Sequence, residues 1–558
     1  MDLPTPVPFF RPLAGSTALL VAMHVACGGS PAPVQGEADG DTLAAATVPP
    51  AGSYDWLIHG GMVVDGTGAP GRILDLLLKD GEIAWMGVVG QETVDVAHVL
   101  DATGLVVAPG FIDAHAHGDP VGSPAFRNFL AMGVTTIVLG QDGSSPPARG
   151  LAQHLEAADR AGPSVNVAYL AGHNTLRLES GVGFGTPDPA GLQALAGLVA
   201  TAMDAGAFGL STGLEYDPGV RAGMDELVAA ARPVAERGGV VMSHMRNEDA
   251  DAVEASLAEL LEQGRRSGAR VHASHLKVVL GHDPAQAQRM LSAMTDARAQ
   301  GYLVTGDVYP YTASFTGLAI LFPDWTRPPH DYAAVARARR AELLEHLRTR
   351  VEGRNGPEAT LFGSGPYAGQ TLADVARARN RPFEEILVEL GPGGARAAYF
   401  VMDEGVMSTF LADPFVAVAS DGSPGMAHPR GYGTFPLILQ RWVQEERLLT
   451  LEEAVRKMTS LPASIVGLDI PGTRPGPPSG ARRARGRISE GWAADLAIFR
   501  LDAVEATADF QEPHRLARGI RHVFVNGEPV WTDGEPVMGP GRGKALRFAP
   551  NGMPPSTN

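Results

Sequence analysis

Two histidines, two residues apart, close a short apolar run near residue 115. His115 and His117 end the sequence FIDAHAH at 111–117, which follows Ala-Pro-Gly at 108–110. In a strand, residues i and i+2 point to the same side, so both imidazoles can reach one metal ion. An isolated His-x-His is more often structural, but its place at the end of an apolar strand favours a metal site here.

Single histidines follow two further apolar runs. His244 comes after GVVM at 239–242, and His275 comes after VHA at 271–273. Each histidine alone could be either a metal ligand or a buried residue with a structural hydrogen bond. In a closed barrel, however, side chains at the carboxyl ends of successive strands converge. We therefore predict that both imidazoles bind metal.

Two aspartates stand at equivalent places. Asp421 follows FVAVA at 415–419, and Asp142 follows VTTIVL at 134–139. The alternative for both is a turn or a helix N-cap, where aspartate is common. In a site that is rich in histidine, we predict that Asp421 accepts a proton from water and that Asp142 is a further oxygen ligand.

These donors supply nitrogen and oxygen but no thiolate. The single cysteine, Cys27, lies far upstream of the apolar runs. Several histidines combined with aspartate suit zinc. Such an ion lowers the pKa of bound water to about 7 and polarises a carbonyl group. The expected chemistry is hydrolysis of an amide or a related acyl bond with one or two divalent ions.

Apolar runs alternate with alanine-rich helical patterns between residues 109 and 470. The clearest helical patterns cover 190–205, 224–237, 249–266 and 284–299. Repeated alternation of strand and helix, about eight times, predicts an α/β fold in which a parallel (β/α)8 (TIM) barrel carries catalytic groups at the carboxyl ends of its strands. A doubly wound open sheet is the alternative.

Residues 322–405 interrupt this rhythm. They contain an arginine-rich helical pattern at 332–350 and a second helical pattern near 370–390. We therefore predict a subdomain inserted into the barrel.

Short strands dominate both ends of the remaining chain. Residues 53–108 carry Asp-Gly hairpin signals, and residues 471–545 carry Asn526-Gly527 after a connector rich in Pro, Gly and Arg. We predict one small β-sandwich built from both segments, followed by a tail at 546–558.

Residues 1–27 resemble a bacterial lipoprotein signal, in which an apolar run from Leu13 to Ala26 precedes Cys27. Such a signal implies export, with lipidation of Cys27 anchoring a periplasmic or outer-membrane protein. Residues 28–52 have no hydrophobic periodicity, which is typical of a flexible linker. An ordinary secretory signal peptide and an extension from a misassigned start are the alternatives.

Charge and hydropathy exclude two classes of partner. Lys and Arg total 45 against 62 Asp and Glu, a formal net charge of −17, and no basic block is present. Nucleic-acid binding is therefore not expected. No apolar run inside the chain body is long enough to span a bilayer, so a lipid anchor at Cys27 would be the one membrane contact.

Five motifs resemble the amidohydrolase superfamily, and all but the first of them resemble its N-acyl-D-amino-acid deacylases (D-aminoacylases). The resemblance extends from about residue 54 to residue 530. The motifs are APGFIDAHAH at 108–117, GLSTGLEY at 209–216, SHMR at 243–246, DVYPY at 307–311 and HPRGYGTF at 428–435. Membership implies a metal-bearing barrel with a β-sandwich and an insertion over the site.

The resemblance also implies a role for each candidate residue. His244 and His275 would hold the main metal ion, and His115 and His117 would hold a second, often weaker one. Asp421 would act as general base and then as general acid.

The resemblance further implies a small-molecule substrate, an N-acyl-D-amino acid that is cleaved to a carboxylate and a free D-amino acid. Lys277, Tyr309 and Arg430 would hold the substrate carboxylate and the region of its carbonyl. Arginine suits a carboxylate because its guanidinium can bind both oxygens. A cyclic amidase or dipeptidase of the same fold and a non-catalytic binding lipoprotein are the alternatives.

One position departs from the family pattern. Where the family has Asn-Cys-Gly, this chain has Gln141-Asp142-Gly143. The cysteine of the family bridges two metal ions, and Asp142 stands in its place. Relatives that use a carboxylated lysine carry it on the fourth strand, where Leu210-Ser211-Thr212 offers none. Asp142 is therefore the best candidate for a bridging ligand.

Overall fold

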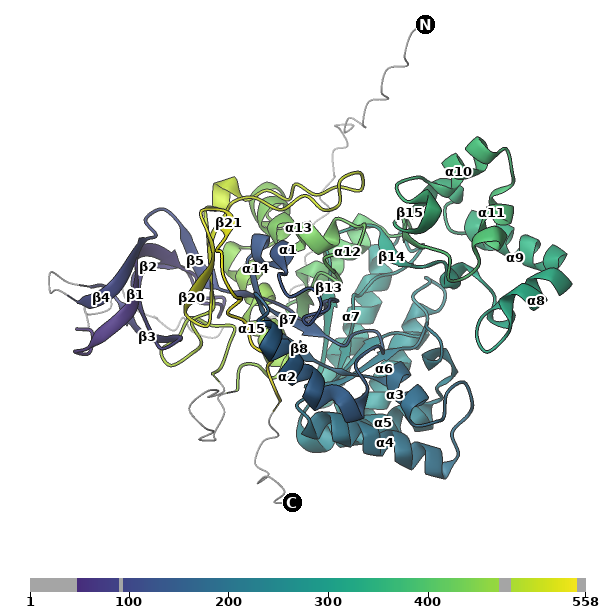
Figure 1. The fold of residues 1–558 in the computed structure, drawn as a ribbon, viewed down its shortest axis with the longest axis horizontal. Helices are drawn as coiled ribbons and strands as arrows, with labels where there is room; N and C mark the ends of the chain where they lie inside the picture. The colour runs from purple at the N-terminus through teal and green to yellow at the C-terminus, as the bar shows by residue number, and fades with distance from the viewer. Residues whose placement is uncertain (1–47, 90–93, 471–482, 549–558) are drawn as a thin grey trace, which may run out of the picture. The chain divides into compact units, whose positions relative to one another are not determined.

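The computed structural model describes residues 48–89, 94–470 and 483–548 (Figure 1). The signal and Cys27, most of the linker, residues 471–482 of the connector and residues 549–558 lie outside the described residues.

Parallel strands form a ring in the described part of the chain. In spatial order they are β6 (Phe111–Asp113), β7 (Val134–Leu139), β8 (Asn166–Tyr169) with its continuation β9 (Ala171–Gly172), β10 (Gly209–Gly213), β11 (Val240–His244), β12 (Arg270–Ala273), β13 (Val304–Val308) and β17 (Val416–Val418). The ends of the series meet at a parallel bridge between Ala116 and Gly422, where the His117 N–H donates to the Gly422 carbonyl at 2.8 Å. The prediction of a (β/α)8 barrel is confirmed.

Helices that cover the barrel alternate with its strands (Figure 1). They include α2 (Leu151–Ala161), α4 (Pro189–Asp204), α5 (Met224–Arg237), α6 (Val253–Ser267), α7 (Pro284–Ala299) and α12 (Glu404–Ala412). Helix α4 starts where the Asp188 carboxylate accepts from the Gly191 N–H, with proline at the first helical position. Asp283 caps α7 in the same way.

Helix α6 begins four residues later than the sequence pattern indicates. Residue 249 forms a β-bridge with Val279 instead, and the Asp249 carboxylate binds Arg350 and Arg354 of the insertion, both at 2.7 Å. These contacts between distant parts of the chain prevent the extra turn of helix.

Segments from both ends of the described chain share one sheet. Its strands are β1 (Ser53–Val63), β2 (Arg72–Lys79), β3 (Glu82–Gly87), β4 (Asp95–Asp101), β5 (Val106–Pro109), β18 (Leu496–Phe499), β19 (Ile520–Val525), β20 (Glu528–Thr532) and β21 (Glu535–Pro536). The two segments join where β5 pairs with β18, with Val107 opposite Ile498. Ile58, Ile498 and Phe524 pack in one buried cluster, so the two segments share a core.

The insertion lies between β13 and β17 and has its own sheet and core. Its strands and helices are β14 (Ser314–Gly317), α8 (Tyr332–Ala338), α9 (Arg340–Glu352), β15 (Thr360–Phe362), α10 (Leu372–Arg379), α11 (Phe383–Leu390) and β16 (Arg396–Tyr399). The first expected helix divides at Arg339, which lies over the Trp325 ring. The second divides at Asn380, which takes the left-handed conformation just before Pro382.

The C-terminal end of the described chain packs against the barrel. Leu546 N–H donates to the Val167 carbonyl at 2.7 Å, and Val167 N–H donates to the Lys544 carbonyl at 2.9 Å. Residues 544–546 therefore extend along β8, and the Phe548 N–H donates to the Gly206 carbonyl at 2.8 Å. Among the described residues, no helix has the length and apolar character that a membrane span requires.

Candidate metal centre

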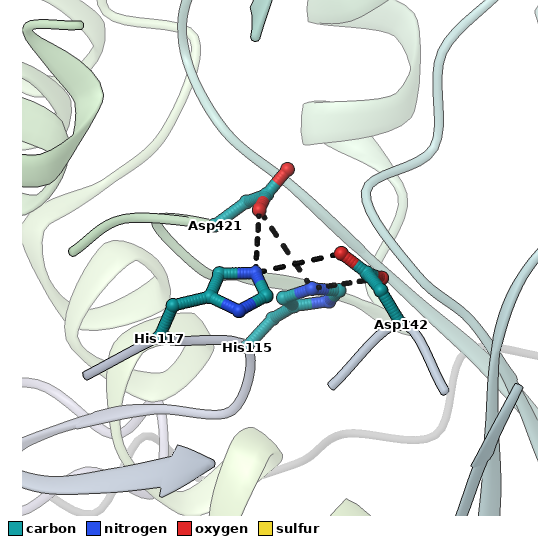
Figure 2. A group of neighbouring side chains, drawn as sticks. All are labelled: His115, His117, Asp142 and Asp421. Atoms are coloured by element: carbon teal, nitrogen blue, oxygen red, sulfur yellow. Dashed lines mark hydrogen bonds and ion pairs between the residues drawn. The ribbon is translucent and has the colours of Figure 1, made fainter. Parts of the chain in front are cut away.

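Four of the candidate residues meet at the carboxyl ends of β6, β7 and β17 (Figure 2). His115 Nε2 lies 3.3 Å from Asp142 Oδ1, and His117 Nε2 lies 3.4 Å from Asp142 Oδ2. Asp421 Oδ1 lies 3.2 Å from His117 Nε2 and 3.8 Å from His115 Nε2. Two imidazoles and two carboxylates thus surround one point.

Asp142 also faces the other two histidines. Its Oδ1 lies 3.4 Å from His275 Nε2 and 3.7 Å from His244 Nδ1. One carboxylate therefore stands between the pair from β6 and the pair from β11 and β12, which is the position that a bridging ligand needs.

Unpaired polar atoms in this cluster indicate an ion. Both ring nitrogens of His115 and Oδ1 of Asp142 are buried and make ion-pair contacts of 3.3 Å or more, but no hydrogen bond, among the described residues. Buried polar atoms without partners are rare in folded proteins. Four imidazoles with a carboxylate are the donors that zinc prefers, so the residues present fit one or two such ions.

Both carboxylates are held in the charged form. Burial acts to raise the pKa of Asp142, but His115, His117 and His275 keep that pKa well below its usual range. Burial acts likewise on Asp421, and its neighbours, led by the Arg430 guanidinium, hold its pKa far below the ordinary value. Both side chains are therefore carboxylate anions, the form that can bind a metal ion.

Three of the same residues have an uncommon backbone conformation. Asp142, His275 and Asp421 have φ angles of 53°, 38° and 48°. Non-glycine residues seldom adopt this left-handed region, and such strain is concentrated at functional sites. Each of the three residues follows within three positions of the end of a barrel strand.

The three predicted carboxylate-binding residues lie beside this cluster. Arg430 contacts Asp421 Oδ2 at 3.0 Å, and Lys277 Nζ lies 2.7 Å from His275 Nδ1. The Tyr309 ring lies under both cations, 4.6 Å from the guanidinium carbon and 5.9 Å from Nζ. All three residues line a cavity of about 560 Å³ together with His117, Asp142, His244, His275 and Asp421.

Two carboxylates of the site were not among the residues predicted from the sequence. Glu215 Oε2 lies 3.1 Å from His244 Nε2, and Glu248 lies 3.1 Å from His275 Nδ1 while it pairs with Lys277 at 2.8 Å. A carboxylate on the second nitrogen of a ligand histidine fixes the orientation of its ring. Glu215 lies within the motif GLSTGLEY, which was a usable signal.

A second network of hydrogen bonds holds the strand ends that carry the candidate metal ligands. Asp307 Oδ2 lies 2.7 Å from His272 Nε2, and its Oδ1 accepts from the His275 N–H at 2.8 Å. Asp113 accepts from the Ser420 backbone and hydroxyl, and burial raises its pKa to about 7 despite these bonds. These side chains hold the strand ends from which His275 and Asp421 project.

Comparisons with known proteins agree with this site. Residues 389–531 match the amidohydrolase family. The N-acyl-D-glutamate deacylase of Alcaligenes xylosoxydans xylosoxydans is 35% identical over 88% of this chain and 96% of its own length.

Solved structures show the same relationship. The N-acyl-D-glutamate deacylase of Bordetella bronchiseptica, complexed with zinc and a phosphonate mimic of the tetrahedral intermediate, is 33% identical, with a TM-score of 0.76 over 89% of this chain and all of that one. A D-aminoacylase with a binuclear metal centre is 30% identical, with a TM-score of 0.73 over the same shares of the two chains. The chain described here therefore belongs to the N-acyl-D-amino-acid deacylase family of metal-dependent amidohydrolases.

Proposed function

We propose that this protein hydrolyses the amide bond of N-acyl-D-amino acids and releases a carboxylate and a free D-amino acid. The observation that carries the proposal is one cavity in which Lys277, Tyr309 and Arg430 lie beside the histidine and aspartate cluster. A cluster suited to water activation is thus adjacent to cations suited to a carboxylate. The activities named for the relatives support this substrate class.

Each group has a distinct part in the reaction. Zinc, held by the four histidines and Asp142, would supply a Lewis acid for the amide carbonyl and acidify water. Asp421, which is charged and lies on the cavity wall, takes a proton from the attacking water and delivers it to the leaving nitrogen. Lys277 and Arg430 hold the substrate α-carboxylate, which fixes the amide relative to Asp421.

The test is amine release from paired enantiomers. Purified, zinc-loaded protein is given N-acetyl-D- and N-acetyl-L-amino acids, and hydantoin replaces them to test the cyclic-amide alternative. We expect hydrolysis of the D series, with the L series slower by about tenfold or more. When the site fixes both the α-carboxylate and the amide, only one enantiomer presents its carbonyl carbon correctly for attack. Absence of amine release from every D substrate, or equal rates for both hands, contradicts the proposal.

Replacement of Arg430 tests the carboxylate contact. We expect Arg430→Ala to raise KM for an N-acyl-D-amino acid by about tenfold or more, the usual cost of losing a hydrogen bond to a charged group. The same variant should raise KM for the methyl ester far less, because the ester has no negative charge for Arg430 to bind. Steady-state kinetics on both substrates measure the difference.

Arg430 also contacts Asp421, so its loss lowers kcat for both substrates. The contribution of the carboxylate contact is therefore measured by the change in KM for the acid divided by the change in KM for its methyl ester. Equal changes in KM for acid and ester would assign Arg430 to the support of Asp421 alone.

We also propose that the protein is exported and anchored through lipidated Cys27. The apolar run from Leu13 to Ala26 ends at this cysteine, and small residues follow it. Cys27→Ser should abolish incorporation of a labelled fatty acid and move the protein from the membrane fraction to the soluble fraction. If the wild type incorporates no label and Cys27→Ser fractionates as the wild type does, a simple secretory signal or no signal is favoured instead.

A further inference from the structure

We propose that Arg396 binds a carboxylate on the side chain of the substrate, so that the preferred substrates are N-acyl derivatives of acidic D-amino acids. The inference rests on the proposed function and specifies the substrate of the same site. Its basis is the pairing of cations around the cavity and the place of Arg396 on the cavity wall.

Three of the four Lys and Arg residues that line the cavity already have carboxylate partners. Lys277 pairs with Glu248 at 2.8 Å, Arg430 with Asp421 at 3.0 Å and Arg354 with Asp249 at 2.7 Å. The guanidinium of Arg396 has neither an ion-pair partner nor a hydrogen bond among the described residues. Arg396 is exposed at the cavity wall, so all of its donors are accessible to a ligand.

Arg396 is adjacent to the site for the α-carboxylate. Arg430 donates to the carbonyl of Phe315 at 3.4 Å, and the Arg396 guanidinium lies 5.5 Å from the centre of the Phe315 ring. A single residue thus separates the two guanidinium groups.

The backbone leaves space beside this guanidinium. Arg396 on β16 stands directly opposite Gly317 on β14, and side chains of such cross-strand pairs share one face. A Cβ at Gly317 would meet no atom closer than 4.0 Å, so the space is open. A substrate side chain that leaves the α-carboxylate clamp along β14 can therefore reach Arg396.

The chemistry favours a carboxylate over other polar groups. A guanidinium can bind both oxygens of a carboxylate through parallel hydrogen bonds, whereas a neutral amide offers one acceptor and no charge. Loss of a hydrogen bond to a charged group lowers affinity by about tenfold or more. The protein should therefore prefer N-acetyl-D-glutamate to N-acetyl-D-glutamine, which has the same length.

The experiment measures kcat/KM for this pair of substrates, and for N-acetyl-D-aspartate with N-acetyl-D-asparagine, in the zinc-loaded full chain. We expect at least one acidic substrate to exceed its amide by about tenfold in the wild type. Arg396→Gln should reduce that ratio to near one, chiefly by lowering kcat/KM for the acid. Arg337→Gln is the matched control, because Arg337 is an exposed arginine of the same insertion that does not line the cavity.

The outcomes separate this inference from the proposed function. Hydrolysis of D substrates without preference for an acid, or with a preference that Arg396→Gln leaves intact, overturns the role of Arg396 and leaves the deacylase activity standing. Absence of hydrolysis of every D substrate overturns both.

Discussion

Asp421→Asn should lower kcat by about 10²–10⁴-fold, the usual contribution of a general acid–base group. Asparagine keeps the size of the side chain but cannot take up the proton of the attacking water. The metal content should stay close to that of the wild type, because the four histidines and Asp142 remain. Plasma emission on the purified variant measures the metal, and amine release measures kcat.

Asp251→Asn is the control for this change. Asp251 is an exposed carboxylate in the segment before α6, and it has no ion pair among the described residues. We expect wild-type turnover from it. Retention of more than about half of the wild-type kcat by Asp421→Asn would rule out the acid–base role, since such groups contribute far more.

The barrel was predictable because its determinants are local. Each strand is a short buried run, and helices such as α4 and α7 begin at Asp-Pro signals that act within a few residues. The candidate ligands were predictable for the same reason, since a polar residue just after a buried parallel strand is brought to the catalytic face by the fold itself. The structure brings all nine predicted site residues to that face.

What the sequence did not reveal depends on contacts between distant residues. Asp307 pairs with His272 across two neighbouring strands, and Asp113 bonds to Ser420 from the opposite end of the barrel sequence. Both are aspartates within apolar runs. The sequence pattern around them does not show that Asp307 contacts the His272 ring or that Asp113 accepts from the Ser420 backbone. The late start of α6 has the same origin, because its cause is the contact of Asp249 with the insertion.

In the insertion, helical periodicity predicts that helices form but not where each helix begins and ends. Helical periodicity marks both pairs of helices, α8 with α9 and α10 with α11. The breaks between them depend on one left-handed residue, Asn380, and on the stacking of Arg339 over Trp325. The strand β14, which brings Phe315 and Gly317 to the cavity, lies before the segment at 322–405 where the change of rhythm is visible.

Asp142→Ala should remove about one equivalent of metal per chain and depress activity, because the variant loses the one anionic ligand that faces both pairs of histidines. In the structure, the Asp142 carboxylate lies within 3.7 Å of His115, His117, His244 and His275. Removal of a carboxylate leaves the positive charges of two neighbouring cations without an offset, so the more weakly held ion should dissociate first. Metal analysis after dialysis against a metal-free buffer gives the stoichiometry.

A second substitution at this position separates a ligand from a turn residue. Asp142→Cys restores an anionic donor, the thiolate that the family pattern places here, and should recover most of the metal that Asp142→Ala loses. A residue that only shaped the turn at φ 53° would respond differently, because alanine and cysteine would disturb the backbone alike. Full metal content and unchanged activity in Asp142→Ala would therefore assign Asp142 to the turn, whereas loss in alanine and recovery in cysteine would identify it as the bridging ligand.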